Sequence, residues 1–131
     1  MFEDKNVIIV DDSPTVRFEV KLLLQQIGLE LVEAGGELGL FMQIEQYGRL
    51  ADMVIMDLTL KEENGFDLIR KLKEDERYSG IPVVVLTEHA DMQNVITAKQ
   101  LGVDGYIRKP IVKDDFLNKV SDILINHELL K

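Results

Sequence analysis

Five polar side chains capable of chemistry stand at or just beyond the ends of short apolar runs of the chain. They are Asp11, Asp12, Asp57, Thr87 and Lys109. Carboxylates brought within a few ångströms of one another repel, and each resists ionisation unless a cation joins them. Because this set contains no His or Cys, it favours a hard divalent ion such as Mg²⁺, which accepts few protein ligands and keeps several waters. These residue types indicate an oxygen-rich metal site, provided that the fold brings them together.

A metal ion beside a carboxylate and an ammonium group is suited to phosphoryl transfer. The cation and Lys109 would neutralise charge on the transferred group, Asp57 would supply the attacking oxygen, and Thr87 would donate a hydrogen bond to a phosphoryl oxygen. Each residue also has an ordinary interpretation, since Asp, Ser and Pro form turns and helix caps and a loop lysine is usually solvated. Their joint placement at four strand ends favours the chemical interpretation.

The apolar runs before these residues are typical of strands in a parallel sheet. Runs at 7–10, 53–56 and 83–86 are continuous and rich in β-branched residues, as in strands that are buried on both faces. The run at 29–34 alternates more and indicates an edge strand, and a shorter run at 105–107 is a candidate for the opposite side of the sheet.

Helical patterns separate these runs. The first helix has Ser13 as its cap, Pro14 at its favoured first position and Gly28 beyond its end. Further helices are expected at about 37–47, from 64–65 through 72, at 91–101 and at 112–129. Five strands that alternate with five helices predict right-handed crossovers and an α/β fold with a doubly wound parallel sheet. Ligands of such sheets bind outside the carboxyl ends of the strands, where the five polar residues are expected.

Length and composition restrict the class of protein. The chain has 131 residues, 46% hydrophobic and 30% charged, which is typical of a single globular domain over residues 1–131. Its formal net charge of -9 argues against direct binding to nucleic acid or to anionic membranes. The absence of cysteine excludes a disulfide framework and a thiolate metal site. With acids at the amino terminus and no apolar run long enough to span a bilayer, we expect a cytoplasmic protein.

The chain closely resembles the receiver domain of bacterial response regulators, the phosphoacceptor module of two-component signalling. The matching segments are Val-Asp-Asp-Ser at 10–13, Ile-Met-Asp at 55–57, Asn-Gly-Phe at 64–66, Val-Leu-Thr at 85–87 and Gly-Tyr-Ile-Arg-Lys-Pro at 105–110. The resemblance extends from Lys5 to the last helix. It implies the flavodoxin-like, CheY-like (βα)5 fold, with five parallel strands in the order 2-1-3-4-5.

The resemblance assigns roles residue by residue. Asp57 corresponds to the phosphoacceptor, Asp12 to a direct Mg²⁺ ligand and Asp11 to a ligand acting mainly through water. The backbone carbonyl of Thr59 would supply a further metal ligand. Lys109 would pair first with Asp57 and then with the phosphoryl group.

The resemblance also implies a switch. Thr87 would be drawn to the phosphoryl group, Tyr106 would turn inward, and the face made by the fourth helix, fifth strand and fifth helix would change shape. A sensor histidine kinase or a phosphotransfer protein would donate the phosphoryl group, and a downstream protein effector would bind the changed face. The Lys109-Pro110 peptide would be cis. We expect a monomer or weak dimer that is not an enzyme, because it assists only its own phosphorylation and dephosphorylation.

Departures from the family pattern leave an alternative open. Glu88 stands where the family usually has a small residue, and in the loop at 59–64 Lys61 and Glu63 replace the common Pro and Met. If Glu88 and the altered loop at 59–64 hinder phosphorylation, the chain is a receiver-like interaction module whose phosphorylation is impaired or absent. If Glu88 points to solvent, the phosphoacceptor interpretation stands. Thr59 and His89 occupy positions that tune phosphoryl lifetime in the family.

Other classes fit less well. An aspartyl-nucleophile phosphohydrolase needs an Asp-x-Asp pair after its first strand, whereas Asp11 and Asp12 are adjacent. A dinucleotide-binding protein needs a Gly-x-Gly-x-x-Gly turn there, which the sequence lacks. His89 and His127, the two histidines, are expected to be solvated rather than catalytic. The sequence leaves open whether the chain is a stand-alone regulator or part of a longer one.

Overall fold

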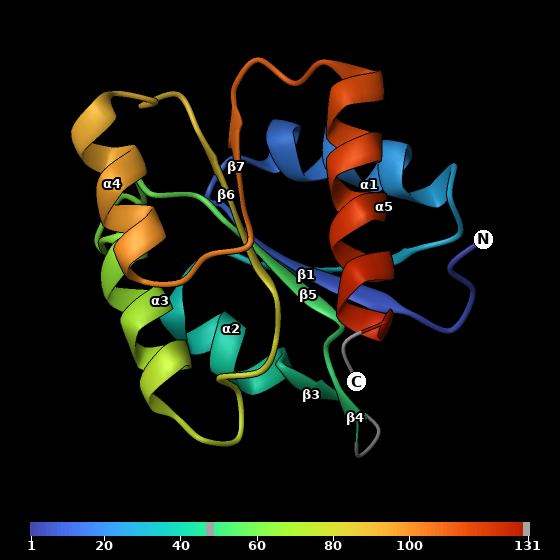
Figure 1. Ribbon diagram of the computed structural model, residues 1–131, viewed down its shortest axis with the longest axis horizontal. Coiled ribbons are helices and arrows are strands. Elements are labelled where there is room, and N and C mark those ends of the chain that lie inside the picture. Colours follow the sequence, from blue (N-terminus) through green and yellow to red (C-terminus); the bar gives the residue numbers. More distant parts are fainter. Residues whose placement is uncertain (47–48, 130–131) are drawn as a thin grey trace.

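A five-stranded parallel sheet lies between two layers of helices in the computed structural model, which describes residues 1–46 and 49–129 (Figure 1). Its strands are β1 (Asn6–Val10), β2 (Glu30–Ala34), β5 (Met53–Met56), β6 (Val83–Thr87) and β7 (Gly105–Arg108). They lie in the order β2-β1-β5-β6-β7, and every neighbouring pair is parallel. Counted among these five strands alone, this is the predicted order 2-1-3-4-5, so the doubly wound α/β fold is confirmed.

The helices divide between the two faces of the sheet (Figure 1). On one face lie α1 (Pro14–Gln25) and α5 (Lys113–Leu129); on the other lie α2 (Glu37–Gln43), α3 (Gly65–Glu74) and α4 (Met92–Gln100). Within the described residues, no helix combines the length and apolar character needed to cross a membrane.

Strand alternation sends successive side chains into two separate cores. In β1, Ile9 packs with Leu24 of α1 and Phe116 of α5, whereas Ile8 joins the cluster that contains Leu68 of α3. All five of these side chains are almost completely buried. Continuous apolar sequence in the central strands therefore serves both faces of the sheet, as expected for strands covered by helices.

The first helix begins as predicted. The Ser13 hydroxyl accepts a hydrogen bond from the backbone N–H of Val16 at 3.3 Å, and Pro14 occupies the first turn. Beyond the helix, Gly28 has φ +84°, a left-handed conformation that glycine adopts without steric cost. This capping fixes where the chain turns after Asp11 and Asp12.

The predicted second helix, at about 37–47, is too long. α2 ends at Gln43, and Glu45–Gln46 form strand β3, which pairs antiparallel with β4 (Arg49–Leu50) outside the main sheet. The reason is tertiary: Ile44 is fully buried, and its carbonyl accepts the N–H of Ala51 at 2.9 Å, which closes the ribbon. The predicted helix end at 47 lies outside the described residues.

Candidate functional site

Three carboxylates meet at the carboxyl edge of the sheet. Asp11 and Asp12 follow β1 and Asp57 follows β5, two adjacent strands whose last residues, Val10 and Met56, are paired. One carboxylate oxygen of each aspartate lies within 4.8 Å of the others. Within residues 1–46 and 49–129, this is the one such group of three or more side chains able to ligate a metal. The clustering predicted from the strand ends is confirmed.

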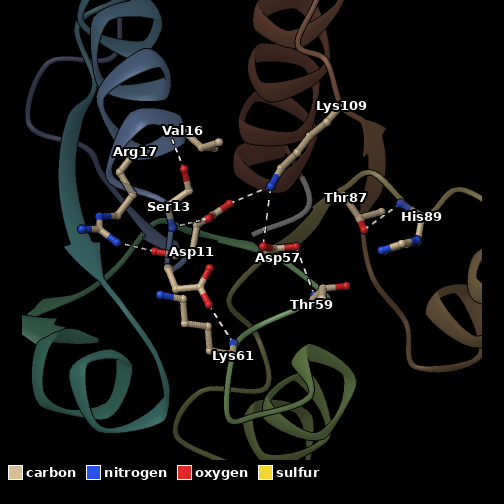
Figure 2. A network of polar contacts seen from close by, with 11 residues as sticks. Asp11, Ser13, Val16, Arg17, Asp57, Thr59, Lys61, Thr87, His89 and Lys109 are labelled. Carbon is tan, nitrogen blue, oxygen red and sulfur yellow. Dashed lines mark hydrogen bonds and ion pairs between the residues drawn. The ribbon is translucent and has the colours of Figure 1, made fainter.

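Lys109 is the cation of this cluster (Figure 2). Its ammonium Nζ lies 2.9 Å from Asp11 Oδ2 and 3.6 Å from Asp57 Oδ2. The residue follows β7, and its backbone N–H donates to the Thr87 carbonyl at 2.8 Å, which places it above the sheet edge. The predicted cis peptide between Lys109 and Pro110 is present. One ammonium among three carboxylates leaves a net negative site, which attracts a further cation.

Burial and neighbouring charges shift the pKa values of both Asp57 and Lys109. Desolvation raises the pKa of Asp57, the charge of Asp11 raises it further, and the Thr59 N–H and Lys109 only partly oppose this. For Lys109, burial by itself would lower the pKa, but the hydrogen bonds and charges of Asp11 and Asp57 outweigh it, so the pKa is raised. Lys109 thus remains protonated, while the Asp57 carboxylate is poorly compensated and gains from any additional positive charge.

The two consecutive aspartates differ in how they are held. Asp11 is 1% exposed, and its oxygens are both engaged: Oδ1 accepts the Ser13 N–H at 2.8 Å and Oδ2 pairs with Lys109. Asp12 is half-buried, and its Oδ2 accepts the backbone N–H of Lys61 at 2.7 Å. Asp12 is therefore the more available of the two for direct contact with an ion.

An open pocket of about 240 Å³ surrounds the cluster. Besides the three aspartates and Lys109, it is lined by Ser13, Val16, Thr59, Glu88 and His89. A single water needs roughly 10–15 Å³ of such space, so the pocket has room for several waters around a cation. Glu88 is exposed and is among the residues that line the pocket, so this acidic residue lies at its edge.

Thr87 and Tyr106 are joined through the loop that follows β6. Thr87 is fully buried, and its Oγ1 accepts the backbone N–H of His89 at 3.1 Å (Figure 2). The Tyr106 hydroxyl donates to the His89 carbonyl at 2.5 Å, and burial, followed by the charge of Asp91, raises the pKa of that hydroxyl. The two predicted switch residues thus share the backbone of His89. Their roles in switching remain predictions.

Sequence reasoning missed two contributors to the site. The Arg17 guanidinium donates to the Asp11 carbonyl at 2.5 Å (Figure 2). It also pairs with Glu33 of β2 at 3.0 Å. The second contributor is the backbone N–H of Lys61, which donates to Asp12. It was missed because every residue type except proline carries a backbone N–H, so the sequence does not mark it. The position of Arg17, one turn into α1, could have suggested the first contact. His127 lies elsewhere, in a pocket lined also by Lys5 and other residues.

A doubly wound sheet with three carboxylates and a lysine at its carboxyl edge is the architecture of a receiver domain. The chain belongs to this family, because residues 7–121 match the model of the response regulator receiver domain. Chemotaxis protein CheY1 of Helicobacter pylori is 35% identical over 124 residues, which cover 90% of this chain and 95% of that protein. Protein PilH of Pseudomonas aeruginosa is 29% identical over 120 residues, covering 90% of this chain and 96% of that protein.

A solved structure supports the same assignment. The CheY-like response regulator receiver domain protein from Methanospirillum hungatei superposes with a TM-score of 0.86 at 25% identity, covering 97% of this chain and 98% of that chain. The protein is thus a receiver domain of the kind used in two-component and chemotaxis signalling.

Proposed function

We propose that the chain is phosphorylated on Asp57 in a Mg²⁺-dependent reaction and that this changes a protein-interaction face. The observation that carries the proposal is the placement of the Lys109 ammonium 3.6 Å from Asp57, beside three carboxylates whose oxygens lie within 4.8 Å. A nucleophilic carboxylate, a fixed cation and a metal-ligand set are the parts that phosphoryl transfer needs.

The donor set fits Mg²⁺, since it consists of oxygen ligands and includes a half-buried carboxylate next to an open pocket of about 240 Å³. Asp12, Asp57 and the Thr59 carbonyl would hold the ion, with Asp11 acting through water. When bound, the ion supplies positive charge that neutralises the carboxylates and the phosphoryl oxygens.

The chain's own residues perform the transfer. An Asp57 oxygen attacks the phosphorus of a phosphohistidine on a sensor histidine kinase or phosphotransfer protein, forming an O–P bond as the P–N bond breaks. The electron pair of that bond stays on the departing imidazole. Lys109, held by Asp11 at 2.9 Å, is close enough to Asp57 to pair with the new phosphoryl oxygens. The protein acts on itself alone, so it is not an enzyme toward other substrates.

The switch follows from the added charge. A phosphoryl group brings about two negative charges and strong acceptor oxygens. The Thr87 hydroxyl turns to this group and gives up its bond to the His89 N–H, and Tyr106, which bonds the His89 carbonyl, follows inward. The face of α4, β7 and α5 then favours its second conformation and binds a downstream protein effector. We further propose that the protein acts in the cytoplasm as a monomer or weak dimer.

A second candidate is a receiver-like interaction module with impaired phosphorylation. It is favoured by Glu88, an acidic residue that lines the same pocket as the three aspartates, and by the altered loop at 59–64. A fourth carboxylate at the mouth would repel an anionic phosphodonor.

Intact mass spectrometry separates the two candidates. We expect Mg²⁺ plus excess acetyl phosphate to add one phosphoryl group to the wild type and to Asp122→Asn, a control on the exposed side of α5, but not to Asp57→Ala. Absence of the adduct at saturating reagent would reject the phosphoacceptor proposal. Labelling of Glu88→Ala alone would then favour the module and identify Glu88 as the barrier.

A further inference from the structure

The segment from Lys61 to Glu63 connects the acidic cluster to helix α2. At one end, the Lys61 N–H donates to Asp12 Oδ2 at 2.7 Å (Figure 2). At the other end, both carboxylate oxygens of Glu63 accept the N–H of Glu37, the first residue of α2, at 3.1 and 3.0 Å. These contacts join residues 49 and 26 positions apart in the chain.

The contact between the Glu63 carboxylate and the Glu37 N–H depends on the glycine that precedes α2. A Cβ atom at Gly36 would lie 2.3 Å from Glu63 Oε1, so the absence of a side chain at Gly36 leaves the space that the carboxylate fills. Lys71 of α3 forms an ion pair with Glu37, and its positive charge also interacts with Glu63. Glu63 is therefore held between α2 and α3, and it fixes the segment that carries Lys61.

The Lys61 contact acts on the aspartate best placed to contact an ion. Both carboxylate oxygens of Asp11 are engaged, one by the Ser13 N–H and the other by the Lys109 ammonium. Asp12 is half-buried, and its Oδ2 accepts a hydrogen bond from the Lys61 N–H. A hydrogen bond on one oxygen limits rotation of the carboxylate and leaves the second oxygen for a cation. Groups that orient metal ligands in this way typically change metal affinity by about 10- to 100-fold when they are removed.

We propose that Lys61 is a positioning residue whose backbone N–H orients Asp12 for Mg²⁺, and that Glu63 holds Lys61 in place by anchoring the segment on α2. Binding of the ion is thereby coupled to the start of α2. This inference rests on the proposed function in taking Mg²⁺ as the ion at Asp12.

A pair of substitutions at one position tests the amide directly. Lys61→Ala and Lys61→Pro both lack the ammonium group, but only proline lacks the N–H. In calorimetric titrations with Mg²⁺ we expect Lys61→Pro to bind about tenfold more weakly than Lys61→Ala. Equal affinities, or tighter binding by Lys61→Pro, would overturn the proposal.

Proline can also distort the loop, so a second measurement leaves Lys61 unchanged. Amide hydrogen exchange in chelator is compared between the wild type and Asp12→Ala. We expect the Lys61 amide to exchange at least about tenfold faster in Asp12→Ala. The Thr59 amide, which donates to Asp57 at 3.1 Å, should be unaffected. An unchanged rate at Lys61 would reject the contact on which the inference depends.

The role of Glu63 is tested by Glu63→Ala against Glu63→Gln, which keeps one acceptor oxygen. We expect Glu63→Ala to weaken Mg²⁺ binding about threefold and to accelerate exchange of the Glu37 amide, with Glu63→Gln close to the wild type. Wild-type affinity in Glu63→Ala would remove Glu63 from the proposal.

These results are independent of phosphoryl transfer. If Asp57 accepts no phosphoryl group but Lys61→Pro still weakens Mg²⁺ binding, the inference holds and the proposed function fails. If Asp57 is labelled and the Lys61 pair binds Mg²⁺ equally, the function holds and the inference fails. A wild type that binds no Mg²⁺ would reject both.

Discussion

Lys109 lies between two buried carboxylates, and its single charge offsets only part of theirs. Asp11 is 1% exposed and Asp57 is 6% exposed, so solvent contributes little to stabilising either anion. A buried ion pair of this kind contributes little net stability, because the cost of desolvating the charges offsets their attraction. Loss of one partner is nevertheless strongly destabilising, because it leaves a buried charge uncompensated. The same imbalance makes the site receptive to a metal ion.

Removal of Lys109 should destabilise the protein when Mg²⁺ is chelated. Lys109→Met leaves Asp11 without its 2.9 Å partner, and we expect the free energy of unfolding at pH 7.5 to fall by about 3 kcal/mol. Lys113→Met, at the exposed start of α5, is the control and should change it by less than about 0.5 kcal/mol. Urea unfolding measures both. A loss for Lys109→Met no larger than that of the control would show that the pair is not desolvated.

The raised pKa of Asp57 gives a pH dependence of definite sign. The folded state binds the Asp57 proton more tightly than the unfolded state, so the ionised carboxylate lowers stability at neutral pH. The loss of stability caused by the ionised Asp57 carboxylate is largest above the raised pKa. It disappears as the pH falls toward about 4, the ordinary pKa of aspartate, where the carboxyl is protonated in both the folded and the unfolded state. In chelator, Asp57→Asn should therefore be more stable than the wild type at pH 7.5, with the difference closing at low pH.

Urea unfolding of the two proteins across this pH range measures the difference. The exposed Asp122→Asn is the control, and its difference from the wild type should not change with pH in this way. An Asp57→Asn variant that is less stable at every pH would show that Lys109 more than compensates the Asp57 charge.

At the scale of elements, the end of β5 and the start of α3 pack too closely to admit a side chain between them. Gly65 is buried, and its N–H donates to the Leu58 carbonyl at 3.0 Å. Asn64 caps the helix by accepting the N–H of Phe66 at 2.8 Å. The loop that carries Thr59 and Lys61 is thereby fixed at its far end as well as at Asp57.

Gly65→Ala should lower stability through this contact. A Cβ at Gly65 would lie 2.2 Å from the Asp57 carbonyl oxygen and 2.7 Å from the Leu58 Cα, both backbone atoms that cannot easily move. We expect a loss of about 2 kcal/mol in thermal or urea unfolding. Gly80→Ala is the matched control, since nothing lies within 4 Å of its Cβ position, and it should be close to neutral. Similar effects in both would contradict the steric explanation.

Elements with local signals could be predicted from the sequence, and contacts that depend on loop conformation could not. Continuous apolar runs indicated the central strands, and Ser13 with Pro14 indicated the start of α1. The ribbon of β3 and β4 was missed because Ile44 leaves the helix for a tertiary reason, its burial against the core. At the site, strand ends predicted which acids meet. They could not predict that a backbone N–H, at Lys61, would hold Asp12.

At the scale of the whole molecule, most of the acidic residues are exposed, whereas a few are concentrated in the buried cluster at the sheet edge. The chain carries 24 acidic against 15 basic residues, and an excess of this size opposes the compact state by self-repulsion. Much of the excess is exposed and screened by salt, whereas Asp11 and Asp57 are buried beside Asp12. A divalent ion at that one place should therefore stabilise the fold more than general screening does.

This reasoning gives a thermal-shift prediction. Ligand binding to the folded state alone contributes about 2.7 kcal/mol at 100 times the dissociation constant, which for a domain of this size raises the melting temperature by about 10 °C. We expect Mg²⁺ at that excess to produce such a shift in the wild type, reversed by chelator and lost in Asp12→Ala. NaCl at equal ionic strength should shift both proteins slightly and alike, since it only screens the acid excess. If NaCl matched Mg²⁺, or if Asp12→Ala kept the full shift, the effect would belong to the surface charge rather than to the cluster of Asp11, Asp12 and Asp57.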